Sequence, residues 1–414
     1  MKTGTASLVA ALACAAAFAD PFGAPPDAMH AWAVHDDNRP NPKKVAVGEN
    51  GIPSDAKVLF DGSAESVAAN WCDSKGEPTK WRVDPDGTLV SVAEAGYIFT
   101  KDAFADCQLH VEWASPVDVD PKLKGQARGN SGVFLMGNFE VQVLDSYETD
   151  PDAPGGNKNP NYADGQAGAV YGQNPPAVNP CRAPGEFNTY DIVFHPPVFD
   201  AAGALVEPAQ ITVFFNGVLV QDGWKFDGPT GYRKRAEYAK WRSDTGLERA
   251  DRMPIAFQDH GNPVRFRNVW VREIPRPSAN TVHGAFYAKA GDVAALRRKT
   301  AAELDAKWDE LWAHIPVGRR LAAAWRIAVY SPTPARMARV DAIEKDFLEA
   351  VKDLPFADDV LKATGIYHGD LRDYLKRVRD AGFFDEDPVL SRLLELPARP
   401  KAPGKNKAQR NNKK

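Results

Sequence analysis

Two polar segments of the sequence carry side chains that could transfer protons. In the first, strict alternation over residues 139–144 would place Glu140 and Gln142 on one face of a β-strand. A β-bulge near Leu144 would return Asp145 to that face, so that three polar groups would line one wall of a cleft. The alternative is that these side chains form the solvent face of an ordinary antiparallel strand.

The second segment, residues 258–263 (QDHGNP), is a polar turn that contains Gln258 and His260 and leads into a strand carrying Arg265. Imidazole titrates near neutral pH, so an accessible histidine in a turn suits general acid or base catalysis. A lone turn histidine more often has no catalytic part, and this alternative remains open.

Residues 129–135 (GNSGVFL), which contain Asn130, belong to the same polar strand region as Glu140. A third segment, residues 165–173 (GQAGAVYGQ), has small residues that could let the backbone approach a ligand, and it ends near Tyr171, whose ring could stack on a sugar. A tightly packed corner would explain this third segment equally well.

Short strands separated by turns must position these groups. Many short apolar or alternating runs, each bounded by Gly, Pro, Asn or Asp, predict an antiparallel β-sandwich of the concanavalin-like, jelly-roll kind. Asn216-Gly217 suits the positive φ angles of a type I′ hairpin turn. The predicted strands are residues 89–92, 107–113, 132–136, 139–144, 190–195, 211–215, 218–221, 255–258 and 264–274.

The chain divides into five predicted regions. These are a signal peptide over residues 1–19, a Pro/Asn/Asp-rich arm of little structure over 20–57, the sandwich over 58–274, a helical region over 275–397 and a basic, disordered tail over 398–414. Apolar positions repeat with helical spacing over residues 292–315, 334–354 and 371–381. Long polar connections at 150–161 and 225–252 are expected to be rim loops or disordered.

The N-terminus predicts export to the periplasm or the extracellular space. A charged start, a short apolar run and Ala17-Phe18-Ala19 fit a cleaved leader, while the sequence before Cys14 is a poor match to a lipoprotein signal. No later segment is apolar enough to span a membrane. The formal net charge of -4 gives no general attraction to nucleic acid.

After the leader, Cys72, Cys107 and Cys181 remain, without the paired spacing of a zinc site. One disulfide or three free thiols are both compatible with that set.

Taken in order, these motifs resemble the 3-keto-disaccharide hydrolase domain family over about residues 58–274. The resemblance rests on LFDG at 59–62, NSGVF at 130–134, FEVQVLDS at 139–146, GAVYG at 168–172, PGEFNTYDI at 184–192, FNGVLV at 215–220 and QDHGNPVRFRNVWVR at 258–272. It implies a jelly roll that processes sugars oxidised at C3 by a separate sugar 3-dehydrogenase. The implied substrate is an oxidised disaccharide, oligosaccharide or other glycoside.

The implied chemistry is elimination. A ketone at C3 acidifies the C2 proton, so a base can remove it and expel the C1 substituent, with or without later addition of water. We assign His260 as general base or acid and Glu140 as its counterpart. The residues expected to bind substrate, among them a group for the enolate, are Asn130, Gln142, Asp145, Tyr171, Gln258 and Arg265.

No cofactor is certain from the sequence. A divalent cation held by Glu140, Asp145 and His260 would stabilise an enolate, but no compact ligand motif demands one. Residues 140–145 also look like the Glu-x-Asp-x-x-Glu strand of laminarinase-type glucanases, with Gln142 in place of the central carboxylate, which disfavours a retaining glycosidase pair. The alternatives to an enzyme are a lectin-like carbohydrate-binding module without turnover, or a scaffold that uses the helical region.

Overall fold

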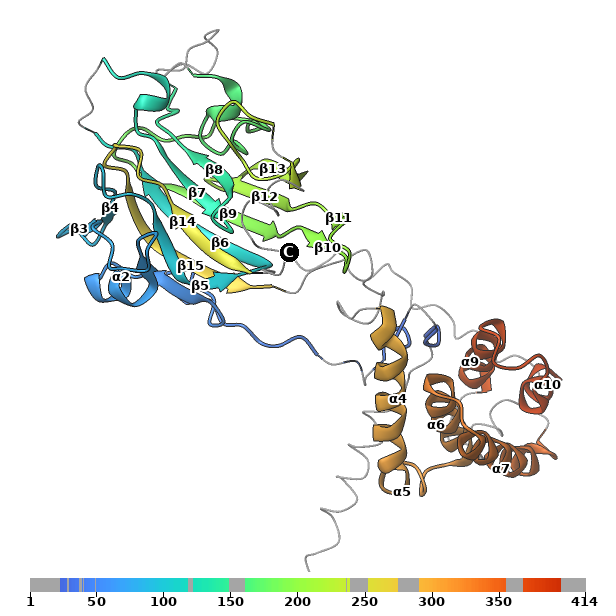
Figure 1. Ribbon diagram of the computed structural model, residues 1–414. Coiled ribbons are helices and arrows are strands. Elements are labelled where there is room, and N and C mark those ends of the chain that lie inside the picture. Colours follow the sequence, from blue (N-terminus) through green and yellow to red (C-terminus); the bar gives the residue numbers. More distant parts are fainter. Residues whose placement is uncertain are drawn as a thin grey trace, which may run out of the picture. The chain divides into compact units, whose positions relative to one another are not determined.

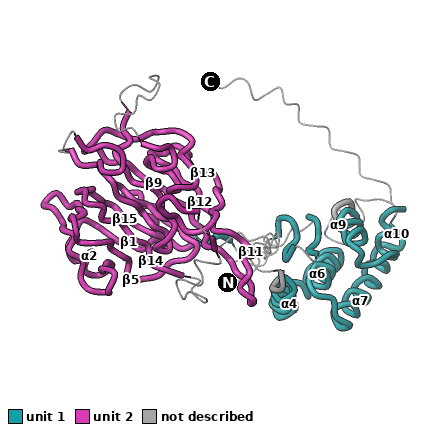
Figure 2. The backbone as a smooth tube through the Cα atoms, turned by 45° about the horizontal axis from the view of Figure 1, so that its top comes forward, with its two compact units in different colours: residues 1–43, 277–414 teal, residues 44–276 magenta. Residues whose placement is uncertain are grey.

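The computed structural model describes residues 23–27, 30–36, 39, 41–48, 50–117, 122–148, 161–235, 237–238, 252–274, 290–354 and 368–395. The chain forms two compact units, a β unit (residues 44–276) and a helical unit (residues 1–43 and 277–414), which Figure 2 shows in different colours. The predicted signal peptide and the predicted basic tail lie outside the described residues.

Two antiparallel sheets build the β unit (Figure 1). The larger, of eight strands, has the order β13-β12-β9-β6-β15-β4-β3, with β1 also paired to β15, and the smaller has the order β2-β5-β14-β7-β8. The described strands of the β unit are β1 (Lys57–Phe60), β2 (Trp71–Cys72), β3 (Arg82–Val83), β4 (Leu89–Val90), β5 (Ile98–Phe104), β6 (Cys107–Ala114), β7 (Ser131–Leu135), β8 (Phe139–Val143), β9 (Asn188–His195), β10 (Val198–Phe199), β11 (Leu205–Glu207), β12 (Gln210–Phe215), β13 (Val218–Lys225), β14 (Met253–Phe257) and β15 (Arg265–Glu273). Strands β10 and β11 pair separately, and α2 (Ala64–Asn70) is the one α-helix among the elements described in this unit.

Alternation along the strands explains the sandwich. In β6, Leu109, Val111 and Trp113 are fully buried, while the residues between them, such as His110, are partly exposed. One hydrophobic cluster joins apolar residues of both sheets, so each sheet buries one face against the other. The predicted β-sandwich with helices toward the C-terminus is confirmed.

All nine predicted strands are present, with shifted ends. The hairpin at Asn216-Gly217 is confirmed: β12 pairs with β13, and the two residues have φ angles of 49° and 77°. Strand β5, a central strand of the smaller sheet, lacked a predicted counterpart because exposed Lys101 and Asp102 interrupt its apolar pattern.

The helical unit contains six described helices: α4 (Ala290–Ala306), α5 (Trp308–Leu311), α6 (Val317–Tyr330), α7 (Pro334–Val351), α9 (His368–Asp380) and α10 (Pro388–Glu395). The three predicted helical segments correspond to α4 with α5, to α7 and to α9. Helix α6 is buried along almost its whole length and packs against α7. The sequence prediction did not include this helix.

Part of the N-terminal arm belongs to the core of the helical unit. Ala31 and Trp32 pack in a cluster with residues of α4 and α6. Asp36 forms an ion pair with Arg326 of α6, and both side chains are almost completely buried. This segment has no sequence periodicity because single side chains, not a regular element, make its contacts.

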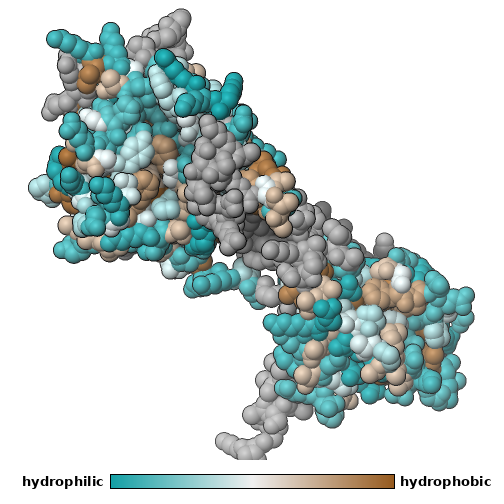
Figure 3. Space-filling model, viewed as in Figure 1, coloured by the Kyte–Doolittle hydropathy of each residue, from teal (hydrophilic) through white to brown (hydrophobic). Residues whose placement is uncertain are grey.

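The surface of the β unit seen in Figure 3 is mostly hydrophilic, with hydrophobic residues in small separate groups. Among the described residues, no helix combines the length and apolar character needed to cross a membrane. Cys72, Cys107 and Cys181 are free thiols.

Candidate active site

A cavity of about 680 Å³ opens on the smaller sheet of the β unit. Phe139, Val141 and Val143 of β8 point into the sandwich core, so Glu140 and Gln142 point to the other face, where the cavity lies. The lining residues are Tyr97, Gln126, Asn130, Phe134, Glu140, Gln142, Asn161, Tyr162, Tyr171, Thr230, Gly231, Tyr232, Gln258 and His260.

A loop that pairs with the edge of β8 covers this face of the sheet. The backbone N–H of Gly168 donates to the carbonyl of Gln142 (2.9 Å), the N–H of Gln142 donates to the carbonyl of Ala169 (3.0 Å), and that of Tyr171 donates to the carbonyl of Glu140 (3.3 Å). Gly168 has a φ angle of 82°, a conformation that glycine adopts without strain. The glycine-rich segment therefore carries Tyr171 to the side of Glu140.

Glu140 is the carboxylic acid of the cavity wall. Its side chain is 5% exposed, and no described residue donates a hydrogen bond to its carboxyl group. Burial raises its pKa to about 8, so the neutral form predominates at neutral pH. Gly132 on the neighbouring strand makes room for the carboxyl group, because a Cβ atom at that position would overlap Oε1 of Glu140 and the ring of Phe134.

Three amide side chains form a hydrogen-bonded cluster beside Glu140. Gln142 Nε2 donates to Asn130 Oδ1 (3.1 Å) and to Gln126 Oε1 (3.2 Å), and Asn130 Nδ2 donates to Gln126 Oε1 (2.9 Å). Tyr190 supports the strand from the core by donating from its hydroxyl to the carbonyl of Gln142 (2.6 Å). These bonds fix the amides in place, as recognition of sugar hydroxyls requires.

Gln258 and Tyr97 add a second polar pair. Gln258 Nε2 donates to the Tyr97 hydroxyl (2.5 Å), which leaves the phenolic proton of Tyr97 free for another acceptor. Burial, above all, raises the pKa of Tyr97, so the phenol remains protonated. The buried Oε1 atom of Gln258 has no hydrogen-bond partner among the described residues.

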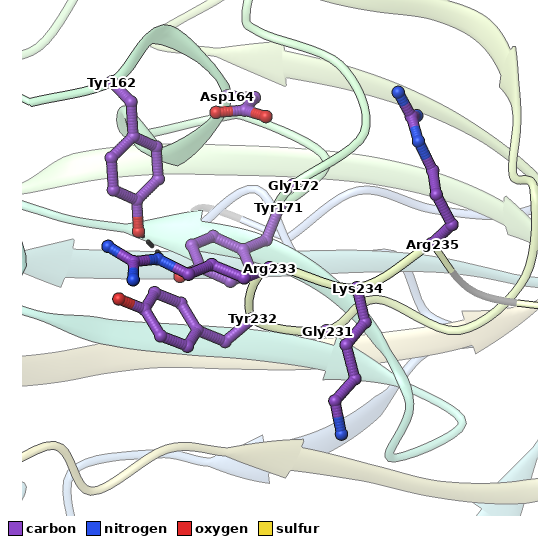
Figure 4. A pocket seen from close by; sticks show the side chains of 9 residues that line it. All are labelled: Tyr162, Asp164, Tyr171, Gly172, Gly231, Tyr232, Arg233, Lys234 and Arg235. Atoms are coloured by element: carbon purple, nitrogen blue, oxygen red, sulfur yellow. Dashed lines mark hydrogen bonds between the residues drawn. The ribbon is translucent and has the colours of Figure 1, made fainter.

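Tyrosines form the outer part of the cavity. The hydroxyl groups of Tyr162 and Tyr171 lie 2.7 Å apart and their ring centroids 6.3 Å apart. Burial raises the pKa of both phenols, and Figure 4 marks the hydrogen bond between them. Aromatic rings of this kind offer flat apolar surface to a sugar ring.

His260 lies in the exposed turn after β14 and lines the same cavity as Glu140. Asp259 holds this turn, because its carboxylate accepts hydrogen bonds from the backbone N–H groups of Gly96 (3.0 Å) and Gly261 (2.8 Å). The predicted residues Asn130, Glu140, Gln142, Tyr171, Gln258 and His260 therefore share one cavity.

Asp145 does not line the cavity. Strands β7 and β8 pair in regular register as far as Val143, and Asp145, two residues further on, is not among the lining residues. Asp145 is buried beyond the end of β8, where Arg128 Nε donates to its carboxylate (2.5 Å).

Arg265 does not line the cavity either. It lies on β15 in the larger sheet, where it pairs with Asp86 and stands over the ring of Phe187 at 5.4 Å. The strand after the polar turn crosses to the larger sheet, so Arg265 is not brought together with Glu140 and His260.

The proposed metal set of Glu140, Asp145 and His260 is not assembled, because Asp145 is engaged elsewhere. The part of the chain that the structure describes contains no group of three or more His, Cys, Asp or Glu side chains arranged to hold a metal ion.

Several lining residues carried no signal of function in the sequence. Tyr97 precedes β5 and Gln126 lies in a short 3-10 turn, and neither belongs to a polar motif. Thr230 and Tyr232 fall in the polar connection 225–252, and the density of aromatic and charged residues there was the one sequence signal that this connection has a function. Thr230 Oγ1 accepts a hydrogen bond from the backbone N–H of Glu140 (3.1 Å), which ties this connection to the site.

Comparison with known proteins gives one family match and a set of similar solved structures. No curated protein matches the chain. A candidate glycosyl hydrolase from Parabacteroides distasonis is 36% identical over 57% of this chain and 93% of its own, with a TM-score of 0.47. A second candidate glycosyl hydrolase from the same organism is 20% identical over 53% of this chain and 94% of its own, with a TM-score of 0.34. A carbohydrate binding module from Bacillus subtilis is 9% identical over 50% of this chain and 96% of its own, with a TM-score of 0.25.

The family match covers residues 55–272, which is more than half of the chain, and its model describes a 3-keto-alpha-glucoside-1,2-lyase-like domain. This agrees with the resemblance drawn from the motifs between residues 58 and 274. The chain belongs to the family of 3-keto-alpha-glucoside-1,2-lyase-like domains, a family of carbohydrate-active enzymes.

Proposed function

We propose that the β unit cleaves the glycosidic bond of 3-keto-glycosides by removing the C2 proton and eliminating the C1 substituent, with or without subsequent addition of water. The observation that carries this proposal is Glu140, a buried carboxylic acid with a raised pKa in a sugar-sized cavity lined by amides and tyrosines.

The reaction needs three functions from the protein. A base takes the C2 proton, and the electrons of the C2–H bond form an enolate with the C3 ketone. The enolate then re-forms the ketone and expels the C1 substituent, whose oxygen takes a proton from an acid. The product is an unsaturated 3-keto sugar, to which water can add at C1 to give net hydrolysis.

The cavity offers a residue for each function. Glu140 is protonated at neutral pH and supplies the proton to the leaving oxygen. His260, in the accessible turn, takes the C2 proton. The phenolic O–H of Tyr97, which is free to donate, binds the enolate oxygen.

The remaining predicted residues bind the sugar. The amides of Asn130, Gln142 and Gln258 accept and donate hydrogen bonds to its hydroxyl groups, and Tyr171 stacks on the ring. Since the substrate carries a ketone at C3, a separate sugar 3-dehydrogenase must supply it. We also propose export through the leader at residues 1–19, consistent with a substrate outside the cytoplasm.

A carbohydrate-binding module without turnover is the second candidate. The pair of tyrosines at the outer part of the cavity favours it, because such a surface holds sugars without any acid or base. The buried neutral carboxyl group of Glu140 favours the enzyme, since a stacking platform does not require it.

The test uses the purified chain with a 3-keto-α-glucoside and its unoxidised parent, each with and without chelator. We expect turnover of the keto sugar alone, and a decrease of about tenfold or more in both Glu140→Gln and His260→Ala. The matched control is Glu186→Gln, an exposed carboxyl group that does not line the cavity. Binding of the sugar without turnover would establish the binding module. Rates in the two variants that equal the wild-type rate would remove both residues from the mechanism. Loss of activity with chelator would add a metal ion to the reaction.

A further inference from the structure

A second hollow, of about 330 Å³, adjoins the candidate active site. It shares Tyr162, Tyr171, Gly231 and Tyr232 with the larger cavity, so the two spaces meet at the tyrosines. Its remaining lining residues are Asp164, Gly172, Arg233, Lys234 and Arg235 (Figure 4).

The charge of this hollow is positive. Three consecutive cationic residues, Arg233, Lys234 and Arg235, line it together with the single carboxylate of Asp164. Among the described residues, none of the three has a carboxylate partner, whereas Arg265 and Arg272 of the same unit are both paired. Their charge is therefore available to a ligand.

Arg233 is the cation directed toward the active site. Figure 4 shows its side chain extending over Tyr232 toward Tyr162, while Lys234 and Arg235 point in other directions. The guanidinium carbon lies 4.9 Å from the centroid of the Tyr232 ring. Stacking on the ring occupies one face of the guanidinium group and leaves the N–H groups at its edge free to pair with an anion.

The hollow lies at the exposed end of the site, since Tyr232 is 59% exposed and Glu140 only 5%. The keto sugar has to meet Glu140, Gln142 and His260 in the larger cavity, and the leaving group must depart to solvent after the bond is cut. A leaving group that extends from the larger cavity across the shared tyrosines would come to lie beside Arg233.

We propose that the hollow is an anion subsite in which Arg233 binds a negatively charged substituent on the leaving group of the glycoside. This inference rests on the proposed function, and it narrows the substrates to glycosides with an acidic leaving group. Neither the fold nor the elimination chemistry requires such a charge.

The experiment compares two substrates of nearly the same shape but different charge, 4-carboxyphenyl and 4-carbamoylphenyl 3-keto-α-glucoside, and takes the change in their kcat/KM ratio between wild type and variant as the readout. We expect kcat/KM to be about five- to tenfold higher for the carboxylate in the wild-type chain, and the preference to vanish in Arg233→Gln because kcat/KM for the carboxylate substrate falls much more than that for the carbamoyl substrate. Arg233→Lys should keep part of the preference, and Lys234→Gln, whose side chain points elsewhere, should keep most of it. The preference should also decrease as salt is added.

Equal kcat/KM for the two substrates would overturn the subsite, and a preference that survives in Arg233→Gln would overturn the assignment of Arg233. If neither substrate is turned over, the proposed function has failed separately. Calorimetric titration with the unoxidised 4-carboxyphenyl and 4-carbamoylphenyl glucosides then decides the subsite on its own, because tighter binding of the carboxylate that depends on Arg233 supports it and equal binding rejects it.

Discussion

Glu140 gives the sharpest test of the electrostatics of the site. Its pKa in the folded chain is about 8, against 4.5 for an ordinary glutamate, because burial disfavours the charged form. Between these values the folded state keeps a proton that the unfolded state has lost. The stability of the wild-type β unit must therefore decrease as pH rises from about 4.5 to about 8.

The size of this effect follows from the shift in pKa. Each pKa unit corresponds to about 1.4 kcal/mol, so the penalty for ionising Glu140 amounts to ~5 kcal/mol over the whole window and to about 2–3 kcal/mol between pH 5 and pH 7. Glu140→Gln has no carboxyl group at this position and should lack that decrease. The stability of the variant minus that of the wild type should therefore increase with pH.

Urea unfolding at pH 5, 6, 7 and 8, followed by tryptophan fluorescence, measures this difference. The β unit buries Trp71 and Trp113, which report on its unfolding. Glu186→Gln, which removes an exposed carboxyl group, is the matched control for the substitution itself. A difference for Glu140→Gln that stays constant, or that decreases with pH, would refute the assignment of a buried neutral carboxyl group. The same pKa predicts that turnover falls above about pH 8, where the acid is lost.

Three further predictions concern other parts of the chain. Gly132→Ala should reduce turnover by about tenfold or more, because the added Cβ displaces the carboxyl group of Glu140; unaltered kinetics would show that the group can shift without cost. Asp36→Ala leaves Arg326 buried without its carboxylate and should lower the stability of the helical unit by about 3–5 kcal/mol in thermal unfolding, while activity on a keto sugar is retained. Burial lowers the pKa of His110, but hydrogen bonds to neighbouring carboxylates outweigh that effect and raise it to about 9. Its stabilising contribution is thus complete below about pH 6.5 and is lost as pH rises through about 9, so His110→Gln should cost about 1–3 kcal/mol at pH 6 and much less at pH 9.5 in urea unfolding.

The sequence predicted the sandwich where side chains alternate strictly. Strand β6 buries every second residue, and the Asn216-Gly217 turn has a chemistry that few other turns share. The same alternation placed Glu140 and Gln142 together, because residues i and i+2 of a strand point to the same face whatever the rest of the fold is.

The sequence could not place the residues whose positions depend on partners far away in the chain. Asp145 follows the end of its strand, and its position is set by Arg128, 17 residues earlier. Arg265 turns toward Asp86, 179 residues away, which no local pattern reveals. Tyr97 enters the cavity only because β5 and β14 pair side by side in the smaller sheet.

The fate of the C2 hydrogen tests the central claim most directly. A 3-keto-α-glucoside labelled with deuterium at C2 can be followed by NMR in ordinary water, with an enzyme-free sample to measure spontaneous exchange. Elimination predicts that deuterium leaves C2 in every molecule whose C1–O bond is cleaved, and that cleavage slows with a primary isotope effect if proton removal limits the rate. Cleavage that retains deuterium at C2, at a rate similar to that of the unoxidised glucoside, would contradict the proposal and identify direct displacement at C1.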